Sequence, residues 1–157
     1  VIIIENKLIG IRDPHGIRPL CLGETSDGLY VLASESCALD ALGANFLRDI
    51  EPGEMVIIDN NEIESIKYKV NSIKSPCSFE FIYFARPDSI IDGIDVYSVR
   101  HEAGRALYEQ NPIEADIVIG VPDSGIPAAI GYSEISGIPY GAALVKNKYL
   151  RKSLLQK

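Results

Sequence analysis

The sequence has no long hydrophobic run and no basic leader. None of its apolar stretches approaches the ~20 residues that a helix needs to cross a bilayer. The apolar start, VIIIENKLIG, has neither a basic flank before it nor a small-residue cleavage site after it, which argues against a secretory signal peptide. The first residue is Val1 rather than Met, so we do not expect it to be a natural start. We therefore expect a soluble protein.

Cysteine and positive charge are also scarce. The three cysteines, Cys21, Cys37 and Cys77, are odd in number and widely spaced, and there is no CxxC pair, which argues against a disulfide framework and a self-contained zinc site. A reducing cytoplasm is the expected location. With 15 Lys and Arg against 22 Asp and Glu, the net charge is −7. This balance argues against a nucleic-acid partner and a membrane surface, so an anionic ligand would need a local site.

The composition is that of a globular protein, since 46% of the 157 residues are hydrophobic and 24% are charged, enough for one domain with a core. From Val1 to about Val70, short apolar strands alternate with turns rich in Gly, Asn and Asp, which predicts antiparallel sheet. One helix is predicted within this part, over Glu35 to Leu47, because Leu39, Leu42 and Phe46 recur at helical spacing.

From Pro76 onward, strands and helices alternate. Strands are predicted at 79–85, 115–121 and 140–147 and helices at 96–110 and 124–136, the last one ended by Gly137. This alternation is typical of a parallel sheet with crossover helices. The expected fold class is therefore α/β, or α+β for the chain as a whole, with a boundary between Lys67 and Pro76.

A polar turn, Pro-Asp-Ser-Gly, joins the predicted strand at 115–121 to the next helix. Backbone N–H groups at the start of a helix have no partner within it, and together with the helix dipole they attract a phosphate oxygen. Ser124 adds a hydroxyl, Gly125 allows close approach of the backbone, and Asp123 or Ser124 can cap the helix. Lys146, at the end of the last predicted strand, either meets a phosphate or is a solvated strand end. Ordinary helix capping uses the same residues, so the pattern alone leaves both interpretations open.

Other polar residues carry weaker signals. Asp13 to Gly16 is predicted to be a turn, with no catalytic role for His15. Glu35 and Asp40 are predicted to cap and pack the short helix. Arg86 to Ser89 follows a predicted strand, and we expect a structural or interface role for it.

Several stretches together resemble one family. RDPHGIRPLCLG (12–23) and ASESCALD (33–40) are similar to class II glutamine amidotransferases, late in their N-terminal-nucleophile glutaminase domain. FEFIYFARPDSIIDGIDVYSVRHEAGRAL (79–107) and ADIVIGVPDSGIPAAIGYSEISGIPYGAALVKNKY (115–149) resemble, more narrowly, the glutamine phosphoribosylpyrophosphate amidotransferase family. The resemblance covers nearly the whole chain to Tyr149, and the tail LRKSLLQK departs from it.

This resemblance implies a middle slice of a longer enzyme. Residues 1–75 would be the C-terminal part of a glutaminase domain, an antiparallel sandwich, and residues 76–157 the first βαβ units of a type I phosphoribosyltransferase domain. The implied reaction is the first step of purine synthesis, in which phosphoribosyl pyrophosphate, glutamine and water give 5-phosphoribosylamine, glutamate and pyrophosphate. A homo-oligomer with purine nucleotides as feedback inhibitors is also implied.

The resemblance assigns site residues as well. The residues implied for pyrophosphate are Val121, Pro122, Asp123, Ser124, Gly125 and Lys146, with Ser124 also associated with Mg²⁺. Cys77 resembles the first cysteine of the structural [4Fe–4S] cluster that some members carry, and a plain packed cysteine is the alternative. The family's paired aspartates, its N-terminal cysteine nucleophile and the arginine and Asn-Gly pair that hold glutamine are absent from the sequence. No catalytic residue is therefore assigned, and the chain by itself is predicted to be inactive.

Two other functions stay open. One is a non-catalytic phosphate-binding or regulatory module that keeps the anion turn, and a reading frame that starts and stops at these residues would favour it. The other is a different class II amidotransferase, such as an asparagine or glucosamine-phosphate synthase. Such an enzyme is not expected to carry the pyrophosphate turn followed by KNKY.

Overall fold

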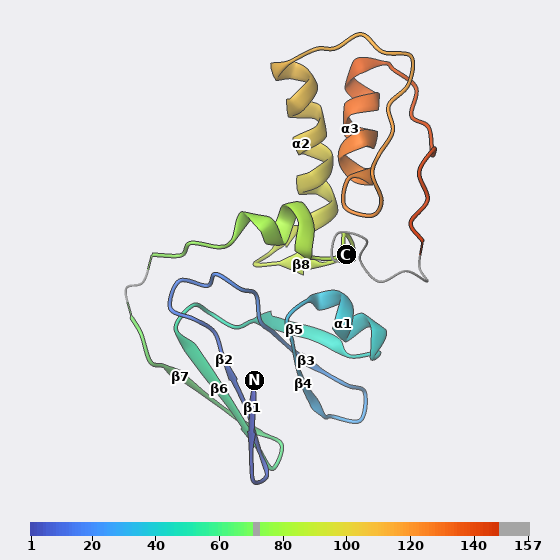
Figure 1. Ribbon diagram of the computed structural model, residues 1–157. Helices are drawn as coiled ribbons and strands as arrows, with labels where there is room; N and C mark the ends of the chain where they lie inside the picture. Colours follow the sequence, from blue (N-terminus) through green and yellow to red (C-terminus); the bar gives the residue numbers. More distant parts are fainter. Residues whose placement is uncertain (71–72, 148–157) are drawn as a thin grey trace, which may run out of the picture. The chain divides into compact units, whose positions relative to one another are not determined.

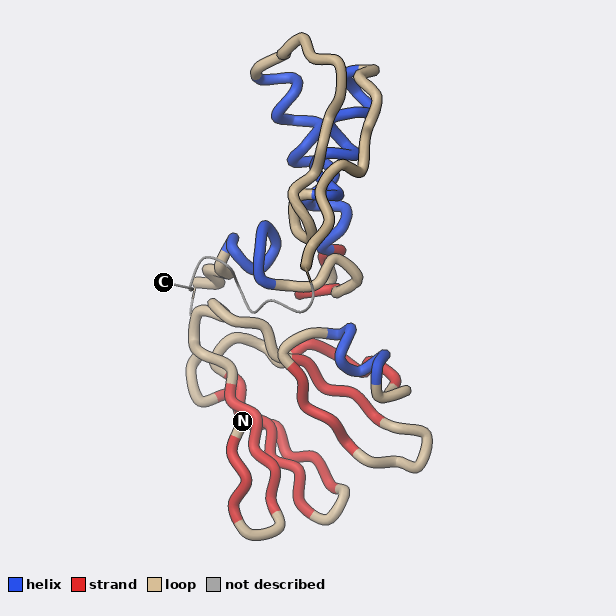
Figure 2. The backbone as a smooth tube through the Cα atoms, turned by 45° about the vertical axis from the view of Figure 1, so that its right-hand side comes forward, coloured by secondary structure: helices blue, strands red, loops and turns tan. Residues whose placement is uncertain are grey.

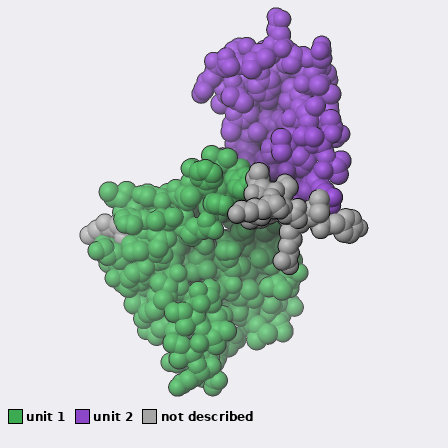
Figure 3. Space-filling view, viewed as in Figure 1, with its two compact units in different colours: residues 1–96 green, residues 97–157 purple. Residues whose placement is uncertain are grey.

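The computed structural model describes residues 1–70 and 73–147. The chain forms two compact units, residues 1–96 and 97–157, which Figure 3 shows in different colours. The units divide later than the predicted boundary, because residues 76–96 cluster with the first unit. The assignment of 1–75 and 76–157 to two domains of a longer enzyme stays a prediction. The unusual tail after Tyr149 lies outside the described residues.

Two antiparallel sheets make up most of the first unit (Figures 1 and 2). The first has the order β1 (Ile2–Ile4), β2 (Lys7–Ile11), β6 (Glu54–Asp59), β7 (Glu62–Lys67), and the second the order β4 (Tyr30–Ala33), β3 (Cys21–Glu24), β5 (Asn45–Asp49). Strand β2 pairs with β6 in a continuous register from Lys7 opposite Asp59 to Ile11 opposite Met55. The prediction of antiparallel sheet in this part is confirmed.

Strand β3, the central strand of the second sheet, is buried on both faces. Leu22 packs in a cluster with Val56 and Ile58 of the other sheet, so the two sheets pack face to face. Its neighbour Cys21 points to the opposite face, where it packs with Leu39 of α1 (Ser36–Ala41). Successive side chains of a strand point to opposite faces, so Leu22 packs against the other sheet and Cys21 packs against α1.

The helix predicted over Glu35 to Leu47 is wrong in its second half. Helix α1 ends at Ala41, because Gly43 takes a left-handed conformation with φ 65°. The residues that follow form β5, in which Phe46 pairs with Gly23 of β3. Pairing with the open edge of β3 outweighs the helical spacing of the apolar residues, so this segment forms a strand.

The strand predicted at 79–85 is also wrong. Residues Glu80–Phe84 form the π-helix η1, with the N–H of Ala85 donating to the carbonyl of Glu80 at 3.0 Å. Phe81 packs against a small core of Ala85, Ile91 and Val96, which favours the coiled backbone over an extended one. The hairpin of β8 (Ile90–Ile91) and β9 (Ile94–Asp95) follows. Its two turn residues have positive φ, 50° and 78°, as a tight hairpin requires.

The second unit contains α2 (Val96–Gln110), apart from its first residue, and α3 (Ile126–Ser136), which lie side by side in Figure 1. Both helices are confirmed, as is the end at Gly137, which has φ 74°. The strands predicted at 115–121 and 140–147 do not form a ladder within the described residues. They meet in one isolated parallel bridge, between Val118 and Tyr140. Parallel strands need cover on both faces, and the apolar residues of 115–121 are largely exposed.

None of the helices in residues 1–70 and 73–147 is long and apolar enough to span a membrane.

Candidate functional site

The polar turn before α3 is a tight loop that needs its glycine. The N–H of Gly125 donates to the carbonyl of Val121 at 3.0 Å, and the N–H of Ile126 reaches the carbonyl of Asp123 at 3.4 Å. A Cβ built on Gly125 would lie 2.8 Å from the Val121 carbonyl oxygen, too close for any side chain. The peptide bond between Pro122 and Asp123 is cis. The backbone of Val121 to Gly125 is therefore folded back on itself at the start of the helix.

Neither Asp123 nor Ser124 caps α3, so that prediction is wrong. The cap residue is Gly125, which has no side chain, and Asp123 contributes its backbone carbonyl instead of its carboxylate. The turn is wound too tightly for either side chain to fold back on the first helical N–H groups. The Ser124 hydroxyl and the Asp123 carboxylate are thus left for other partners at the positive end of the helix dipole.

Lys146 lies beside this turn. Its Nζ forms an ion pair with Oδ2 of Asp123, and the two side chains are 56% and 61% exposed. The parallel bridge between Val118 and Tyr140 explains why Asp123 and Lys146 are close. Asp123 lies five residues after Val118, and Lys146 lies six residues after Tyr140. The ends of the two parallel segments therefore fall at the same edge, where ligands of α/β proteins bind. Two of the predicted pyrophosphate residues, far apart in sequence, are brought together.

Close packing between α2 and α3 supports the turn. A Cβ on Gly104 of α2 would lie 1.9 Å from the carbonyl oxygen of Ala128, and a Cβ on Gly131 of α3 would lie 2.1 Å from that of His101. The helix backbones therefore approach each other without intervening side chains. His101 also contacts Glu134 through Nε2 at 3.0 Å. The first turn of α3, and with it the loop before it, is held against a rigid neighbour.

A divalent cation would find oxygen donors at the turn but no complete site. The Ser124 hydroxyl and the Asp123 carboxylate are the side-chain oxygens it offers. No group of three or more His, Cys, Asp or Glu side chains in the described parts of the chain is placed to hold a metal. This donor set fits Mg²⁺, which is commonly held by few protein oxygens together with substrate phosphates and water.

Cys77 precedes η1 in the first unit. Its thiol is half-buried, and its N–H donates to the carbonyl of Ile17 at 3.1 Å. Four thiolates hold a [4Fe–4S] cluster, and the other two cysteines of this chain are buried elsewhere in the core. The cysteines of this chain therefore do not fit a complete cluster site, and Cys77 alone would be one ligand of it.

Burial makes the two core cysteines poor candidates for a nucleophile. Burial raises the pKa of Cys21 to about 11, and its Sγ donates to the carbonyl of Ala33 at 3.3 Å. Burial also raises the pKa of Cys37. Burial therefore disfavours the thiolate, the nucleophilic form, at both cysteines.

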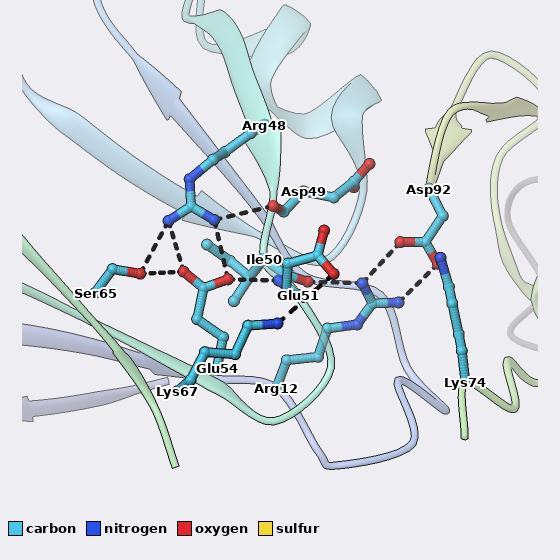
Figure 4. A network of polar contacts seen from close by, with 10 residues as sticks. All are labelled: Arg12, Arg48, Asp49, Ile50, Glu51, Glu54, Ser65, Lys67, Lys74 and Asp92. Atoms are coloured by element: carbon cyan, nitrogen blue, oxygen red, sulfur yellow. Dashed lines mark hydrogen bonds and ion pairs between the residues drawn. The ribbon is translucent and has the colours of Figure 1, made fainter. Parts of the chain in front are cut away.

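The first unit contains a polar network around a buried carboxylate, which the sequence did not reveal (Figure 4). The Glu54 carboxylate, 4% exposed, accepts two hydrogen bonds from Arg48, at 2.7 and 3.0 Å. It also accepts the hydroxyl of Ser65 and the N–H of Glu51. The network links β5, β6 and β7, and thus joins the two sheets. Every oxygen of this carboxylate is occupied by protein donors, so its role is structural.

A second ion pair, Arg12 with Asp92, belongs to the same region (Figure 4). Both terminal guanidinium nitrogens donate to the carboxylate, at 2.8 and 2.9 Å, and the side chains are 2% and 8% exposed. Arg12 further donates to the carbonyl oxygens of Ile50, Gly16 and Arg18. Lys74 lies 3.1 Å from Asp92. The ion pair ties the β8–β9 hairpin to the end of β2, eighty positions earlier in the chain.

An open cavity of about 580 Å³ lies beside these two networks. The charged side chains that line it are Arg48, Asp49, Glu51, Glu54, Lys67, Lys74 and Asp92. Positive and negative groups are mixed and largely paired with one another. The cavity is lined by residues of the first unit, and none of the predicted pyrophosphate residues lines it.

The remaining sequence predictions concern structural residues. Asp13 to Gly16 is a turn, as predicted, with the N–H of Gly16 on the carbonyl of Asp13 at 3.0 Å. Glu35 accepts the N–H of Arg86 at 2.7 Å and the hydroxyl of Ser89 at 3.0 Å. Ser89 is fully buried. Glu35 is the N-cap residue of α1, but its side chain makes no capping hydrogen bond, so the predicted capping role is wrong. Its carboxylate attaches α1 to the segment 86–89 instead.

Curated proteins match the chain over nearly its whole length. An amidophosphoribosyltransferase from Archaeoglobus fulgidus is 52% identical over 153 residues, which cover 98% of this chain and 33% of that protein. One from Bacillus subtilis is 49% identical over 156 residues, which cover 99% of this chain and 33% of that protein. The chain thus spans about a third of the length of these relatives. No protein-family model matches it.

Two solved structures match the fold. A glutamine phosphoribosylpyrophosphate amidotransferase from B. subtilis, complexed with ADP and GMP, has a TM-score of 0.88 at 49% identity, covering 97% of this chain and 33% of its own. A structure described as the allosteric regulatory enzyme of purine biosynthesis has a TM-score of 0.88 at 49% identity and covers 97% of this chain and 32% of its own.

Proposed function

The chain is a homologue of about one third of amidophosphoribosyltransferase, and from this premise we propose that it is a segment of an enzyme of that family. The reaction converts phosphoribosyl pyrophosphate, glutamine and water to 5-phosphoribosylamine, glutamate and pyrophosphate. The observation that carries the proposal is the agreement of sequence and fold with the B. subtilis enzyme, 49% identity at a TM-score of 0.88. A longer protein supplies the parts that this chain lacks.

Within that enzyme, residues 1–75 belong to the glutaminase domain and residues 76–157 to the phosphoribosyltransferase domain. The first segment holds no N-terminal cysteine, and the raised pKa of Cys21 supports its exclusion as a nucleophile. Glutamine hydrolysis therefore depends on residues outside this chain.

The segment Val121 to Gly125, with Lys146, holds the pyrophosphate group of the substrate. When ammonia attacks C1 of the ribose, the C1–O bond to pyrophosphate breaks and negative charge grows on the leaving oxygens. The α3 N-terminus and Lys146 stabilise this charge, because both present positive potential at one edge. The Ser124 hydroxyl would hold Mg²⁺ brought in with the substrate, and the ion would supply screening of the phosphate charge.

Replacing Ser124 tests this assignment. In the complete protein, Ser124→Ala is expected to lower ammonia-dependent synthesis of phosphoribosylamine by about 10- to 100-fold, the scale of losing one oriented donor. Glutamine hydrolysis is expected to stay at the wild-type rate. The matched control is Ser136→Ala, at the far end of α3. Unchanged phosphoribosyl transfer in Ser124→Ala would refute the assignment.

Cys77 provides one thiolate of a [4Fe–4S] cluster whose other ligands lie outside this chain. The half-buried thiol supports this proposal, since the other two cysteines are buried in the core. Iron and sulfide analysis of the anaerobically purified complete protein tests it. We expect bound iron and sulfide in the wild type and in Cys37→Ser, and their loss in Cys77→Ser. An iron-free wild type would rule out the role.

The enzyme forms a homo-oligomer and binds purine nucleotides as feedback inhibitors. The nucleotide proposal draws on the related B. subtilis structure, which is a complex with ADP and GMP. Light scattering tests the oligomer, and inhibition of pyrophosphate release by ADP and GMP tests the regulation.

A further inference from the structure

Asp123 places a negative charge where the proposed function puts a polyanion. It lies in the turn whose backbone begins α3, and its carboxylate is 61% exposed. A bare carboxylate there would repel pyrophosphate. Its ion-pair partner is Lys146, which the proposed function requires for the same pyrophosphate. One lysine is thus shared between an internal anion and the ligand.

We propose that Asp123 is a positioning residue that holds Lys146 at the turn in the free protein and is displaced from it by the pyrophosphate group. The inference rests on the proposed function and adds an internal competitor to it. Lys146 belongs to the segment after Gly141, and the parallel hydrogen bonds around Val118 end at that glycine. The ion pair with Asp123 is the contact that keeps its ammonium at the turn when no ligand is present.

Asp123 therefore positions the Lys146 side chain in advance but lowers the affinity for pyrophosphate. A lysine side chain loses rotamer freedom when it is fixed, and Asp123 fixes it before the ligand arrives. Breaking the exposed Asp123–Lys146 ion pair costs little free energy, so a ligand with several phosphate oxygens replaces Asp123 as the partner of Lys146. Binding is weakened by that cost and by repulsion from the released carboxylate.

Calorimetry on the complete protein, with inorganic pyrophosphate as the probe, tests the proposal. Without divalent cations, Asp123→Asn is expected to bind pyrophosphate about three- to ten-fold more tightly than the wild type. Lys146→Met is expected to bind it more weakly. In the Lys146→Met background no ion pair remains to be broken, so the gain from Asp123→Asn is expected to shrink to the part that comes from the carboxylate's repulsion, which a purely structural effect of the substitution would not produce. Asp123→Glu, which keeps the charge, is expected to behave as the wild type.

Asp116→Asn is the matched control. Asp116 is exposed in the same unit, at the start of the segment that leads to the turn, and its loss changes the net charge by the same amount. Its affinity for pyrophosphate is expected to equal that of the wild type. Equal tightening in Asp116→Asn and Asp123→Asn would reduce the effect to net charge and overturn the inference.

The other outcomes separate the inference from its premise. If Lys146→Met weakens binding and Asp123→Asn does not tighten it, the internal competitor is refuted and the pyrophosphate site stands. If Asp123→Asn weakens binding, with Mg²⁺ or without it, Asp123 contacts the ligand or its metal directly, and the inference fails. If the wild type binds no pyrophosphate, or Lys146→Met binds it equally well, the proposed site fails and the inference fails with it.

Discussion

Single charged residues join parts of the first unit that lie far apart in the sequence. Burial alone would raise the pKa of Glu54, but hydrogen bonds from Arg48, Ser65 and the N–H of Glu51 outweigh it and lower the pKa from 4.5 to about 2. A carboxyl whose pKa is depressed by folding stabilises the folded state above its unfolded pKa. That stabilisation disappears as the pH falls through the folded value.

We expect Glu54→Gln to lower the free energy of unfolding by about 2 kcal/mol near neutral pH, the scale of losing charged hydrogen bonds. The difference from the wild type is expected to shrink as the pH falls from 4.5 to about 2, because the carboxyl is protonated in the unfolded chain over that range while it stays ionised in the folded one. Urea unfolding of the complete protein at several pH values measures it. A difference that stays constant across this range would contradict the account.

The Arg12–Asp92 ion pair makes a larger prediction. Asp92→Asn leaves a buried guanidinium without its counter-ion, and we expect a loss of about 3 kcal/mol in the free energy of unfolding. Asp88→Asn is the control, because the Arg86–Asp88 ion pair has a similar distance of 2.7 Å but is exposed. We expect little change there. Equal losses in the two variants, by urea unfolding, would show that burial of the ion pair does not matter.

These residues also show where sequence reasoning stops. The turn at Asp13 to Gly16 and the polar segment Val121 to Gly125 are local patterns, and both were predicted. The partners Arg12 and Asp92 are eighty positions apart. Neither side chain has any local signal that it is buried, so only the folded backbone reveals the pair.

At the scale of elements, the α2–α3 contact supports the proposed site. Alanine normally stabilises a helix relative to glycine by about 1 kcal/mol. At Gly104 the added Cβ would overlap the carbonyl oxygen of Ala128, at 1.9 Å, so Gly104→Ala must push the helices apart. We expect it to destabilise the protein and to weaken pyrophosphate binding. Glu109→Ala, exposed on the same helix, is the control, and calorimetry with pyrophosphate is the measurement. Unchanged affinity for pyrophosphate in Gly104→Ala would show that the α2–α3 packing does not support the site.

Helices α2 and α3 were predictable because periodicity and a terminal glycine are local. The elements that were missed depend on partners. Strand β5 forms because the edge of β3 is open to it, and η1 coils because Phe81 has a core to enter. The segments 115–121 and 140–147 were predicted as strands, and in the described residues they meet through a single bridge. Strand pairing and packing against other elements decided the structure of β5, of η1 and of these two segments, and no short sequence pattern contains that information.

At the scale of the whole molecule, the chain exposes an apolar sheet edge. All three residues of the edge strand β1 are exposed isoleucines, and an uncovered apolar edge invites pairing with another strand. We expect the isolated 157-residue chain to self-associate. Light scattering on the purified chain measures this, and Ile3→Lys, on the edge strand, is expected to reduce it. A monodisperse monomer of the unmodified chain would contradict the expectation.

The central claim is that this chain is a segment of an amidophosphoribosyltransferase that contributes its pyrophosphate-binding turn. The most direct measurement follows glutamate and pyrophosphate release from glutamine and phosphoribosyl pyrophosphate with Mg²⁺, for the complete protein and for the 157-residue chain. We predict equal amounts of both products from the complete protein and neither product from the chain alone, because positioning by the missing residues is worth several kcal/mol of the barrier. A complete protein that releases no pyrophosphate, or turnover by the chain alone above the buffer rate, would contradict the account.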